Sequence, residues 1–381
     1  MNLTAMVSSR SGCRTVCPLC QRLWQIDRPR STRGGAGAGI IFPGKRRGTG
    51  RSAVLKSGPR HDQMAGEGRP MTDFTLLNFA GANGAAVPGI KVGDSVIPIA
   101  EGLAAIGRKN VAWAGSTKAA LGAWGDAEKR LSELAGKSGD AAVKAVAKPL
   151  SSVRLLAPVI YPDAIFCAFA NFTDHMKEMS DRSPPDKATV QPLHFVKLGA
   201  HCVIGPEETI QLPAISKQVD WEGELAVVIG KPARNVAAKD AMNYVAGYTI
   251  MNDLSLRDRG TRKDWNVRHD FLLGKSFDTG APMGPWIVPA KQVKDVYKLT
   301  MKQWVTGELM QDSDTSYMHF TIAEQIEALS RQFTLRPGDV IATGSPSGNG
   351  RPRGIYLKPG DDLLVEIQDI GRLHNPIVQG E

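Results

Sequence analysis

The stretch 220–230, which reads DWEGELAVVIG, constrains the fold of this chain more than any other. Successive side chains of a β-strand point to opposite faces, so Glu222 and Glu224 share a face with Ala226 and Val228. The other face is apolar and consists of Trp221, Leu225, Val227 and Ile229. The pattern therefore predicts a strand that is buried on both faces and carries two carboxylates at its head.

These two carboxylates need a compensating charge, because like charges beside a buried strand are unfavourable, and a divalent cation is the simplest candidate. A third carboxylate, Asp253, follows the apolar segment GYTIMN, from whose end it can reach a neighbouring strand. Three carboxylates without nearby His or Cys suit Mg²⁺, Mn²⁺ or Ca²⁺ and disfavour zinc. The alternatives are two solvated glutamates at a strand end and an Asn-Asp turn that caps a strand.

Two further positions carry groups suited to proton transfer and charge stabilisation. In CAFANFTDHMKE, His175 lies three residues before Glu178, so both lie on one face of a helical turn. A carboxylate beside an imidazole orients the ring and stabilises its protonated form, as a general base requires. Lys275 lies within the otherwise apolar run FLLGKSF, where it can stabilise an oxyanion. The alternatives are a solvated helix face for the pair and a lysine whose amine extends to solvent.

The net charge of +9 originates in the first 70 residues. These hold 13 Lys and Arg against 3 Asp and Glu, whereas the remaining 311 residues hold 34 basic and 35 acidic side chains. A near-neutral body gives no argument for nucleic-acid binding. The chain has no run of 18 apolar residues, so no segment is predicted to span a membrane.

Residues 1–70 form a basic leader rich in Arg, Gly, Ser and Pro, which is predicted to be disordered. Such a leader is either an organellar transit peptide or the product of a start codon placed too far upstream. We favour the second explanation, because Met71 precedes a strand-like segment, and we therefore predict a cytoplasmic protein. A mitochondrial location follows only if the leader is a genuine transit peptide.

The body divides into a small N-terminal domain over residues 71–150 and a larger domain over residues 151–381. The first combines short strands with an Ala-rich helical stretch over 117–147. The second is dominated by short strands separated by Pro and Gly, with one helix predicted over 235–245. This pattern predicts an α+β, mostly β fold instead of a doubly wound sheet.

A second helix of the larger domain is predicted to begin at Thr321. Thr321 as N-cap and Glu324 three residues later form a capping box. The apolar face of this helix contains Ile322, Ile326, Leu329 and Phe333, at helical spacing.

The order of motifs along the chain resembles that of the fumarylacetoacetate hydrolase family. The motifs are NFxxHxxE, DWEGELAVVIG, GYTxxNDxSxRD, GKSFD, GPW and PGDVIxTG, and they extend from about residue 155 to 378. The resemblance implies a mixed β-sandwich roll with a small N-terminal α/β unit. It also implies a homodimer and a Mg²⁺, Mn²⁺ or Ca²⁺ ion held by carboxylates.

The resemblance also assigns roles to individual side chains. The implied metal ligands are Glu222, Glu224 and Asp253. The implied catalytic residues are a water-activating dyad and a cation beside the reacting oxygens, namely His175, Glu178 and Lys275. The turn that contains Gly344 and Ser345 falls where the family contacts the carboxylate or carbonyl end of its substrate.

Two departures from the family pattern concern substrate binding. Phe172 stands where the family often has Tyr, so one hydroxyl is lost from the predicted substrate site. Gly260 stands where the family often has Gln, and Arg259, Arg262 and Arg268 lie in the same loop. Our hypothesis is that one of these arginines, with Arg259 first, binds a substrate carboxylate and favours a dicarboxylic or longer oxo acid.

The resemblance predicts a metal-dependent hydrolase that cleaves a carbon–carbon bond in a 2,4-dioxo acid of the acylpyruvate or fumarylpyruvate type. Such reactions belong to the catabolism of aromatic compounds or amino acids. The alternative is a decarboxylase, isomerase, hydratase or lyase that acts on a related oxo acid through an enolate. A non-catalytic dimer is disfavoured because all six implied ligands and catalytic residues are present. The expected partner is a small oxo acid, with neither nucleic acid nor membrane.

Overall fold

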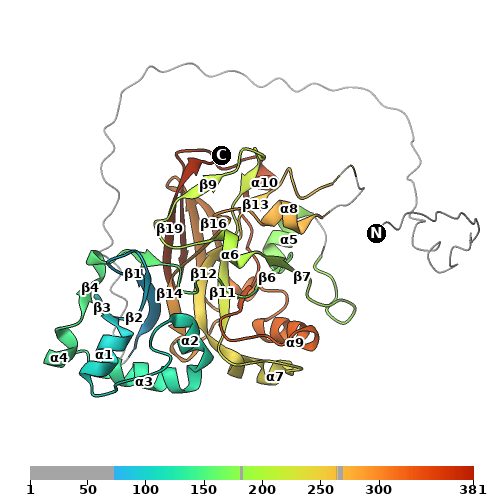
Figure 1. Ribbon diagram of the computed structural model, residues 1–381. Coiled ribbons are helices and arrows are strands. Elements are labelled where there is room, and N and C mark those ends of the chain that lie inside the picture. The colour runs from blue at the N-terminus through green and yellow to red at the C-terminus, as the bar shows by residue number, and fades with distance from the viewer. Residues whose placement is uncertain (1–72, 181–182, 263, 265–268) are drawn as a thin grey trace, which may run out of the picture. The chain divides into compact units, whose positions relative to one another are not determined.

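The computed structural model describes residues 73–180, 183–262, 264 and 269–381 (Figure 1). The predicted leader, residues 1–70, and Arg268 lie outside these residues. The described residues fall within one compact unit. They form three β-sheets with short helices, so the predicted α+β, mostly β fold class is confirmed.

The largest sheet has twelve strands. In chain order they are β1 (Thr75–Ala80), β2 (Ala86–Val92), β3 (Ser95–Pro98), β4 (Lys148–Pro149), β5 (Leu155–Leu156), β6 (Ile165–Ala168), β7 (His194–Lys197), β8 (Val203–Ile204), β11 (Gly223–Ile229), β12 (Val245–Asn252), β14 (Ala281–Pro289) and β17 (Val340–Ala342). The main path runs β4-β3-β2-β1-β14-β12-β11-β17-β6-β7, while β5 pairs with β1 and β8 with β14. The sheet is mixed, because β17 pairs with β6 and β14 with β8 in parallel among mostly antiparallel neighbours.

Two smaller sheets complete the β structure. The five-stranded sheet has the order β16-β15-β18-β19-β9. Its strands are β9 (Ile210–Leu212), β15 (Thr300–Val305), β16 (Glu308–Asp314), β18 (Asp362–Ile367) and β19 (Gly371–Gln379). The third sheet pairs only β10 (Val219–Asp220) with β13 (Ser255–Leu256).

The helices are short. They are α1 (Ile99–Ala105), α2 (Thr117–Gly122), α3 (Trp124–Gly136), α4 (Ala141–Lys144), α5 (Thr173–Met179), α6 (Gly199–Cys202), α7 (Ala238–Ala241), α8 (Phe271–Lys275), α9 (Ile322–Gln332) and α10 (Gly350–Arg353). Figure 1 shows α1 to α4 gathered beside β1, β2 and β3. The helical stretch predicted over 117–147 is thereby confirmed as α2, α3 and α4. Among the described residues, no helix has the length and apolar character needed to cross a membrane.

The two helices predicted in the larger domain fared differently. The capping box at the start of α9 is present, since Thr321 accepts from the Glu324 amide and the Glu324 carboxylate accepts from the Thr321 amide. Three members of its predicted apolar face are buried, namely Ile322, Ile326 and Leu329. Phe333 was wrongly included, because the helix ends before it and its side chain is 44% exposed. The helix predicted over 235–245 was also wrong in extent. Asn235 adopts a left-handed φ of 52°, and only α7 and a 3₁₀ turn at Met242–Tyr244 are helical.

Strand β11 is buried on both faces, as predicted, because it lies between two separate apolar cores. Leu225, Val227 and Ile229 pack into a core shared with Met301 and Val365 of the five-stranded sheet. On the other face, alternate side chains pack into a core that extends to α1, α2 and α3, namely Ala226 and Val228. Burial of each larger apolar side chain contributes roughly 1.5–3 kcal/mol, so the strand is held firmly from both sides.

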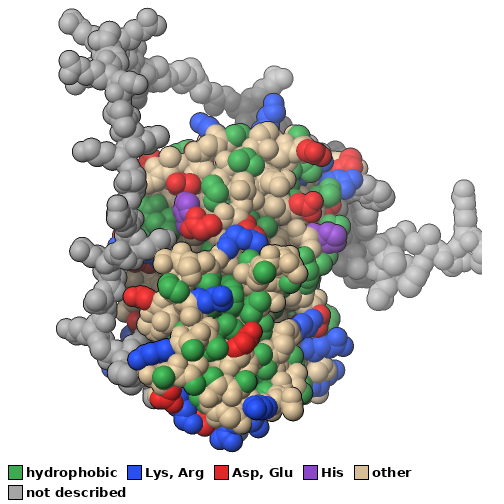
Figure 2. Space-filling view, turned by 60° about the vertical axis from the view of Figure 1, so that its left-hand side comes forward, with side chains coloured by type: hydrophobic (Ala, Val, Ile, Leu, Met, Phe, Trp, Pro, Cys, Tyr) green, Lys and Arg blue, Asp and Glu red, His purple; other side chains and the backbone are tan. Residues whose placement is uncertain are grey.

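The N-terminal strands continue the large sheet, because Leu76 of β1 lies opposite Ile287 of β14. The division of the body near residue 150 therefore stays a prediction. Figure 2 shows basic and acidic side chains interspersed over one face of the molecule, in keeping with the near-neutral composition of the body.

Candidate active site

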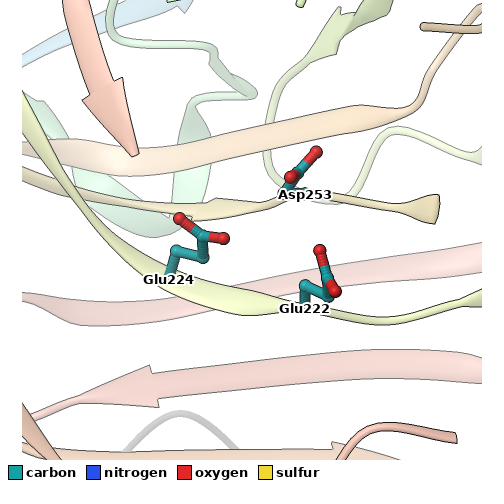
Figure 3. Close-up of side chains that lie close together, drawn as sticks. All are labelled: Glu222, Glu224 and Asp253. Atoms are coloured by element: carbon teal, nitrogen blue, oxygen red, sulfur yellow. The ribbon is translucent and has the colours of Figure 1, made fainter. Parts of the chain in front are cut away.

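The three predicted metal ligands lie together where β11 begins and β12 ends (Figure 3). Glu222 and Glu224 extend from the same side of one strand, and Asp253 directly follows the neighbouring strand. One carboxylate oxygen from each residue lies within 4.8 Å of the others. All three residues are buried, with exposed fractions of 6%, 1% and 1%. The sequence-based expectation that these side chains meet is therefore met in the structure.

Backbone pairing fixes this arrangement. Gly223 lies opposite Asn252 in the β11–β12 register, and the Asn252 side-chain oxygen accepts from the Glu222 amide at 2.9 Å. The Asp253 amide donates to the Glu222 carbonyl oxygen at 2.8 Å. A Cβ at Gly223 would lie 2.5 Å from Oε1 of Gln303, so a larger residue there would displace that side chain.

The electrostatic environment differs between the two glutamates. Burial raises the pKa of Glu224 well above its usual range, and the Asp253 and Glu222 carboxylates add to this effect. Burial also opposes ionisation of Glu222, but Lys275 and Arg257 together hold the pKa of Glu222 well below its usual range. Ionisation is therefore favoured at Glu222 and disfavoured at Glu224.

Two buried lysines contact the cluster, and only one of them was predicted. Nζ of Lys275 donates to Glu222 and, at 2.8 Å, to Oδ2 of Asp253. Nζ of Lys197, which is fully buried at the end of β7, donates to Oδ1 of Asp253 at 2.5 Å and to the Leu254 carbonyl at 2.8 Å. Burial alone would lower the pKa of Lys275, but Asp253 and Glu222 raise it above its usual range, which keeps the amine protonated. The available signal for Lys197 was a lysine within the apolar run HFVKL.

Arg257 forms ion pairs with Asp220 and Glu222 that the sequence did not predict. Arg257 donates through Nε to Asp220 at 2.7 Å and through Nη2 to Glu222 at 2.6 Å. Asp220 is fully buried and also accepts from the Gly350 and Arg351 amides. This arrangement leaves one oxygen of Glu222 bonded to Arg257 and the other to Lys275.

The His–Glu pair forms on α5 as predicted. Nδ1 of His175 lies 3.3 Å from Oε2 of Glu178, and both carboxylate oxygens of Glu178 accept from the Gly348 amide at 3.0 Å. Burial would raise the pKa of Glu178, but the bonds to His175 and Gly348 lower it below its usual range. The ionised carboxylate favours a proton on Nδ1 and leaves Nε2 of His175 free to accept one. A positive charge on His175 would lower the pKa of Glu222, so the dyad lies near the cluster.

The predicted substrate turn lies against the metal cluster. The Gly344 amide donates to Oε2 of Glu224 at 2.8 Å, and its φ of 105° favours glycine. A Cβ at Gly344 would also lie 2.9 Å from Cβ of Asn171. Ser345 is 6% exposed and accepts from Nε2 of Gln311. Contact of Gly344 and Ser345 with substrate stays a prediction.

The other predicted substrate residues lie in two places. Phe172 is fully buried in the core beside β11, and its substrate contact stays a prediction. Arg259 is exposed and lines a hollow together with Arg262 and Leu273. Arg262 is bonded to Asp264 and Asp270, so of these two arginines Arg259 is better placed to bind a ligand.

The cluster suits a divalent metal. Its donor set is three carboxylates, which hard cations prefer, and a bound cation would favour the ionised form of Glu224. Lys197, Lys275 and Arg257 already form ion pairs with Asp253 and Glu222. The carboxylate that needs further positive charge is therefore Glu224. Glu222, Glu224 and Asp253 thus form a candidate site for a divalent ion whose identity the geometry does not specify.

Comparison with known proteins shows the family of this chain. Residues 164–378 match the family described as fumarylacetoacetate (FAA) hydrolase C-terminal. The oxaloacetate tautomerase Fahd2a, mitochondrial, of Rattus norvegicus is 40% identical over 234 residues, which cover 60% of this chain and 71% of the relative. This chain therefore belongs to the fumarylacetoacetate hydrolase family and is an enzyme of that family.

Solved structures of the same family share the fold. The 2-hydroxyhepta-2,4-diene-1,7-dioate isomerase from Mycobacterium marinum is 30% identical, with a TM-score of 0.58, covering 80% of this chain and 98% of the other. The maleylpyruvate hydrolase from Sphingobium sp. SYK-6, in complex with manganese(II) ion and pyruvate, is 29% identical, with a TM-score of 0.61, covering 81% and 100%. The family thus includes isomerases and hydrolases, so membership alone leaves the reaction undetermined.

Proposed function

We propose that this protein is a divalent-metal-dependent tautomerase that interconverts the enol and keto forms of oxaloacetate or a closely related 2-oxo dicarboxylate. The observation that carries the proposal is the buried cluster in which three carboxylates lie within 4.8 Å of one another beside Lys275. Such a cluster suits stabilisation of an enolate. The 40% identity to an oxaloacetate tautomerase supports this reaction over others in the family.

Glu222, Glu224 and Asp253 would hold the cation, which when bound supplies electrostatic stabilisation of negative charge on the substrate oxygens. Lys275 provides a further fixed positive charge in a buried setting, where a charge interaction is stronger than in water. Because its pKa is raised, Lys275 stabilises the enolate as a cation and does not act as the base.

His175 is the group suited to move the proton at C3 of the substrate. Its Nδ1 faces Glu178, so Nε2 is available to take a proton from C3 and return it. Glu178 holds the ring orientation and stabilises the imidazolium that forms. In the keto-to-enol direction, one proton leaves C3 and one joins the C2 oxygen, and the reverse reaction exchanges the same two protons.

A dicarboxylate needs a second anion-binding group in addition to the metal cluster. We assign this role to Arg259, which is exposed on the loop that follows Arg257. The turn containing Gly344 and Ser345 is assigned to the other end of the substrate, because it lies directly against Glu224.

The test is to mix the full-length protein with enol-oxaloacetate and follow loss of the enol by its near-ultraviolet absorbance, with Mn²⁺ or Mg²⁺ and again with EDTA. We expect metal-dependent acceleration over the buffer rate, without release of pyruvate. An unchanged enol decay at saturating metal would refute the tautomerase proposal.

Carbon–carbon hydrolysis of an acylpyruvate is the second candidate. The specific observation in its favour is the His175–Glu178 dyad, which is equally suited to activating water, as is the likeness to a maleylpyruvate hydrolase. The measurement is pyruvate release from a panel of acylpyruvates. Metal-dependent formation of pyruvate with the matching acid would establish hydrolysis, and absence of pyruvate would exclude it for that panel.

The homodimer and the cellular location stay predictions. Sedimentation of the full-length protein tests the dimer. The named relative is mitochondrial, which is the location that a genuine transit peptide in residues 1–70 would give, whereas a misplaced start codon predicts the cytoplasm. Fusion of residues 1–70 to a fluorescent reporter distinguishes the two, because only a transit peptide would carry the reporter into mitochondria.

A further inference from the structure

We propose that Gln311 on β16 is a positioning residue that sets the His175–Glu178 dyad relative to the metal cluster. The inference rests on the proposed function, because it concerns the same site. It originates in the loop that follows β17, residues 343–351, which contacts both glutamate ligands and Glu178 of the dyad.

The loop contacts the cluster and the dyad at three positions. The Gly344 amide donates to Glu224, and the Gly348 amide donates to Glu178. Nδ2 of Asn349 donates to Oε1 of Glu222 at 3.3 Å. The orientation of Glu178, and through it of His175, therefore depends on where this loop lies with respect to β11.

The Gln311 side chain connects this loop to β11. Its Nε2 donates to Oγ of Ser345 and to the Pro346 carbonyl, both at 2.9 Å. Its Oε1 accepts from the Gly223 amide at 3.1 Å. Gly223 lies between the two glutamate ligands, so a single buried amide joins the loop that holds the dyad to the strand that carries the ligands.

The loop fits closely against β16 at the same point. Gly348 has a φ of 101°, and a Cβ there would lie 2.0 Å from the Met310 carbonyl oxygen and 2.9 Å from Cα of Gln311. Gln311 is 1% exposed, so water cannot readily replace its hydrogen bonds. Loss of its amide would remove the connection between the loop and Gly223, while leaving Glu178 and the metal ligands chemically intact.

Gln303 supplies a matched control. It lies opposite Gln311 in the β15–β16 register, is also 1% exposed, and also approaches Gly223. In contrast to Gln311, its amide nitrogen and oxygen have no hydrogen-bond partner among the described residues. Replacing either Gln by Met removes one amide from the same buried layer, but only Gln311→Met breaks a connection to the loop.

The first experiment compares Gln311→Met and Gln303→Met in the full-length protein by steady-state kinetics with Mn²⁺ and by hydrogen exchange of the loop. We expect Gln311→Met to lower kcat by about 10- to 100-fold with KM nearly unchanged, because a displacement of about 1 Å can cost 100-fold. Exchange of the peptide spanning 344–351 should become faster in Gln311→Met and stay at the wild-type rate in Gln303→Met. Equal effects of the two variants on kcat and exchange would overturn the proposal.

A double-mutant cycle separates positioning from general loss of stability. If Gln311 acts through Glu178, Gln311→Met should have little further effect on kcat in a Glu178→Gln background. A full additional loss there would mean that Gln311 acts elsewhere. If the wild-type protein fails to tautomerise oxaloacetate, the function proposal fails, while loop exchange still decides whether Gln311 holds the loop.

Gln311→Glu provides a variant of the same shape in case Gln311→Met does not fold. A protonated carboxyl can still donate to the loop and accept from Gly223, whereas a carboxylate can only accept. Burial raises the pKa of the introduced carboxyl, so it should lose its proton only as the pH rises to about 9. The ratio of the activity of Gln311→Glu to that of the wild type should therefore fall over this pH range. A ratio that stays at unity throughout would contradict the proposal.

Discussion

Lys197 offers the sharpest test of how charge is balanced at the site, and we predict that Lys197→Met destabilises the metal-free protein. Lys197 is fully buried, and its Nζ bonds to Oδ1 of Asp253 at 2.5 Å and to the Leu254 carbonyl at 2.8 Å. Methionine has a similar length and no charge. The substitution therefore removes one of the two ammonium groups that contact Asp253 while preserving most of the packing.

The expected magnitude follows from the burial of the pair. Removing one partner of a buried ion pair costs roughly 3–5 kcal/mol, because the remaining charge is left without compensation. Asp253 retains Lys275, so we expect a loss at the lower end, about 3 kcal/mol. A divalent cation at the cluster would restore positive charge beside Asp253, so the loss should shrink when metal is bound.

The assay is urea unfolding followed by far-ultraviolet circular dichroism, in EDTA and in saturating Mn²⁺. Lys187→Met is the matched control, because Lys187 pairs with Glu324 at 2.8 Å at the surface, where both side chains are about one-third exposed. Exposed pairs contribute about 0–1 kcal/mol, so this variant should change little in either condition. The Lys197 variant should gain more stability from Mn²⁺ than the wild type does.

Two results would refute this reasoning. If Lys197→Met in EDTA loses no more stability than Lys187→Met, Lys197 does not compensate a buried charge. If Mn²⁺ stabilises the Lys197 variant less than the wild type, the cation does not substitute for the lost ammonium group at Asp253. Either outcome would remove Lys197 from the charge balance of the site.

Four further outcomes are expected. Lys275→Ala should lower kcat by roughly 100- to 1000-fold with a smaller change in KM, because a buried electrostatic group of this kind stabilises the transition state by about 3–4 kcal/mol. An effect confined to KM would contradict this role. His175→Ala should abolish turnover while the Mn²⁺ affinity, measured by electron paramagnetic resonance, stays near that of the wild type. Arg259→Ala should raise KM for a dicarboxylate more than for a monocarboxylate, and an equal change would exclude Arg259 as the carboxylate-binding group. Burial lowers the pKa of His194 from 6.5 to about 4, so the unfolded chain takes up a proton at a higher pH than the folded chain does. The free energy of unfolding should therefore fall as the pH drops through this range. His194→Gln should reduce that fall in urea titrations between pH 7 and 4.

The local elements of the fold could be predicted because their signals lie within a few residues of one another. The capping box of Thr321 and Glu324 and the alternation along β11 are of this kind. The helix predicted over 235–245 failed, because Asn235 adopts a left-handed conformation and its amide bonds to the Ser330 carbonyl of α9 instead of continuing a helix. Phe333 failed for a related reason, since α9 ends one residue earlier.

At the site, the sequence predicted the groups that motifs carry and missed those that reach the cluster from elsewhere. His175 and Glu178 lie within one helical turn, so their contact follows from spacing. Lys197 lies 56 residues from Asp253, and Gln311 lies 88 residues from Gly223. No local pattern determines such contacts, because they depend on the order of strands in the sheets.

By itself, then, the sequence determined that β11 is buried on both faces and that Glu222 and Glu224 project from the same side, because strand alternation is a local property of the backbone. Only the tertiary structure decided which charges balance these carboxylates. Pairing of β7 with β6 places Lys197 beside Asp253, and packing of β16 against the loop after β17 places Gln311 beside Gly223. The physical reason is that a buried charge or amide is stabilised by whichever partner the fold brings within hydrogen-bond distance, and that partner is fixed by sheet order and not by neighbouring residues.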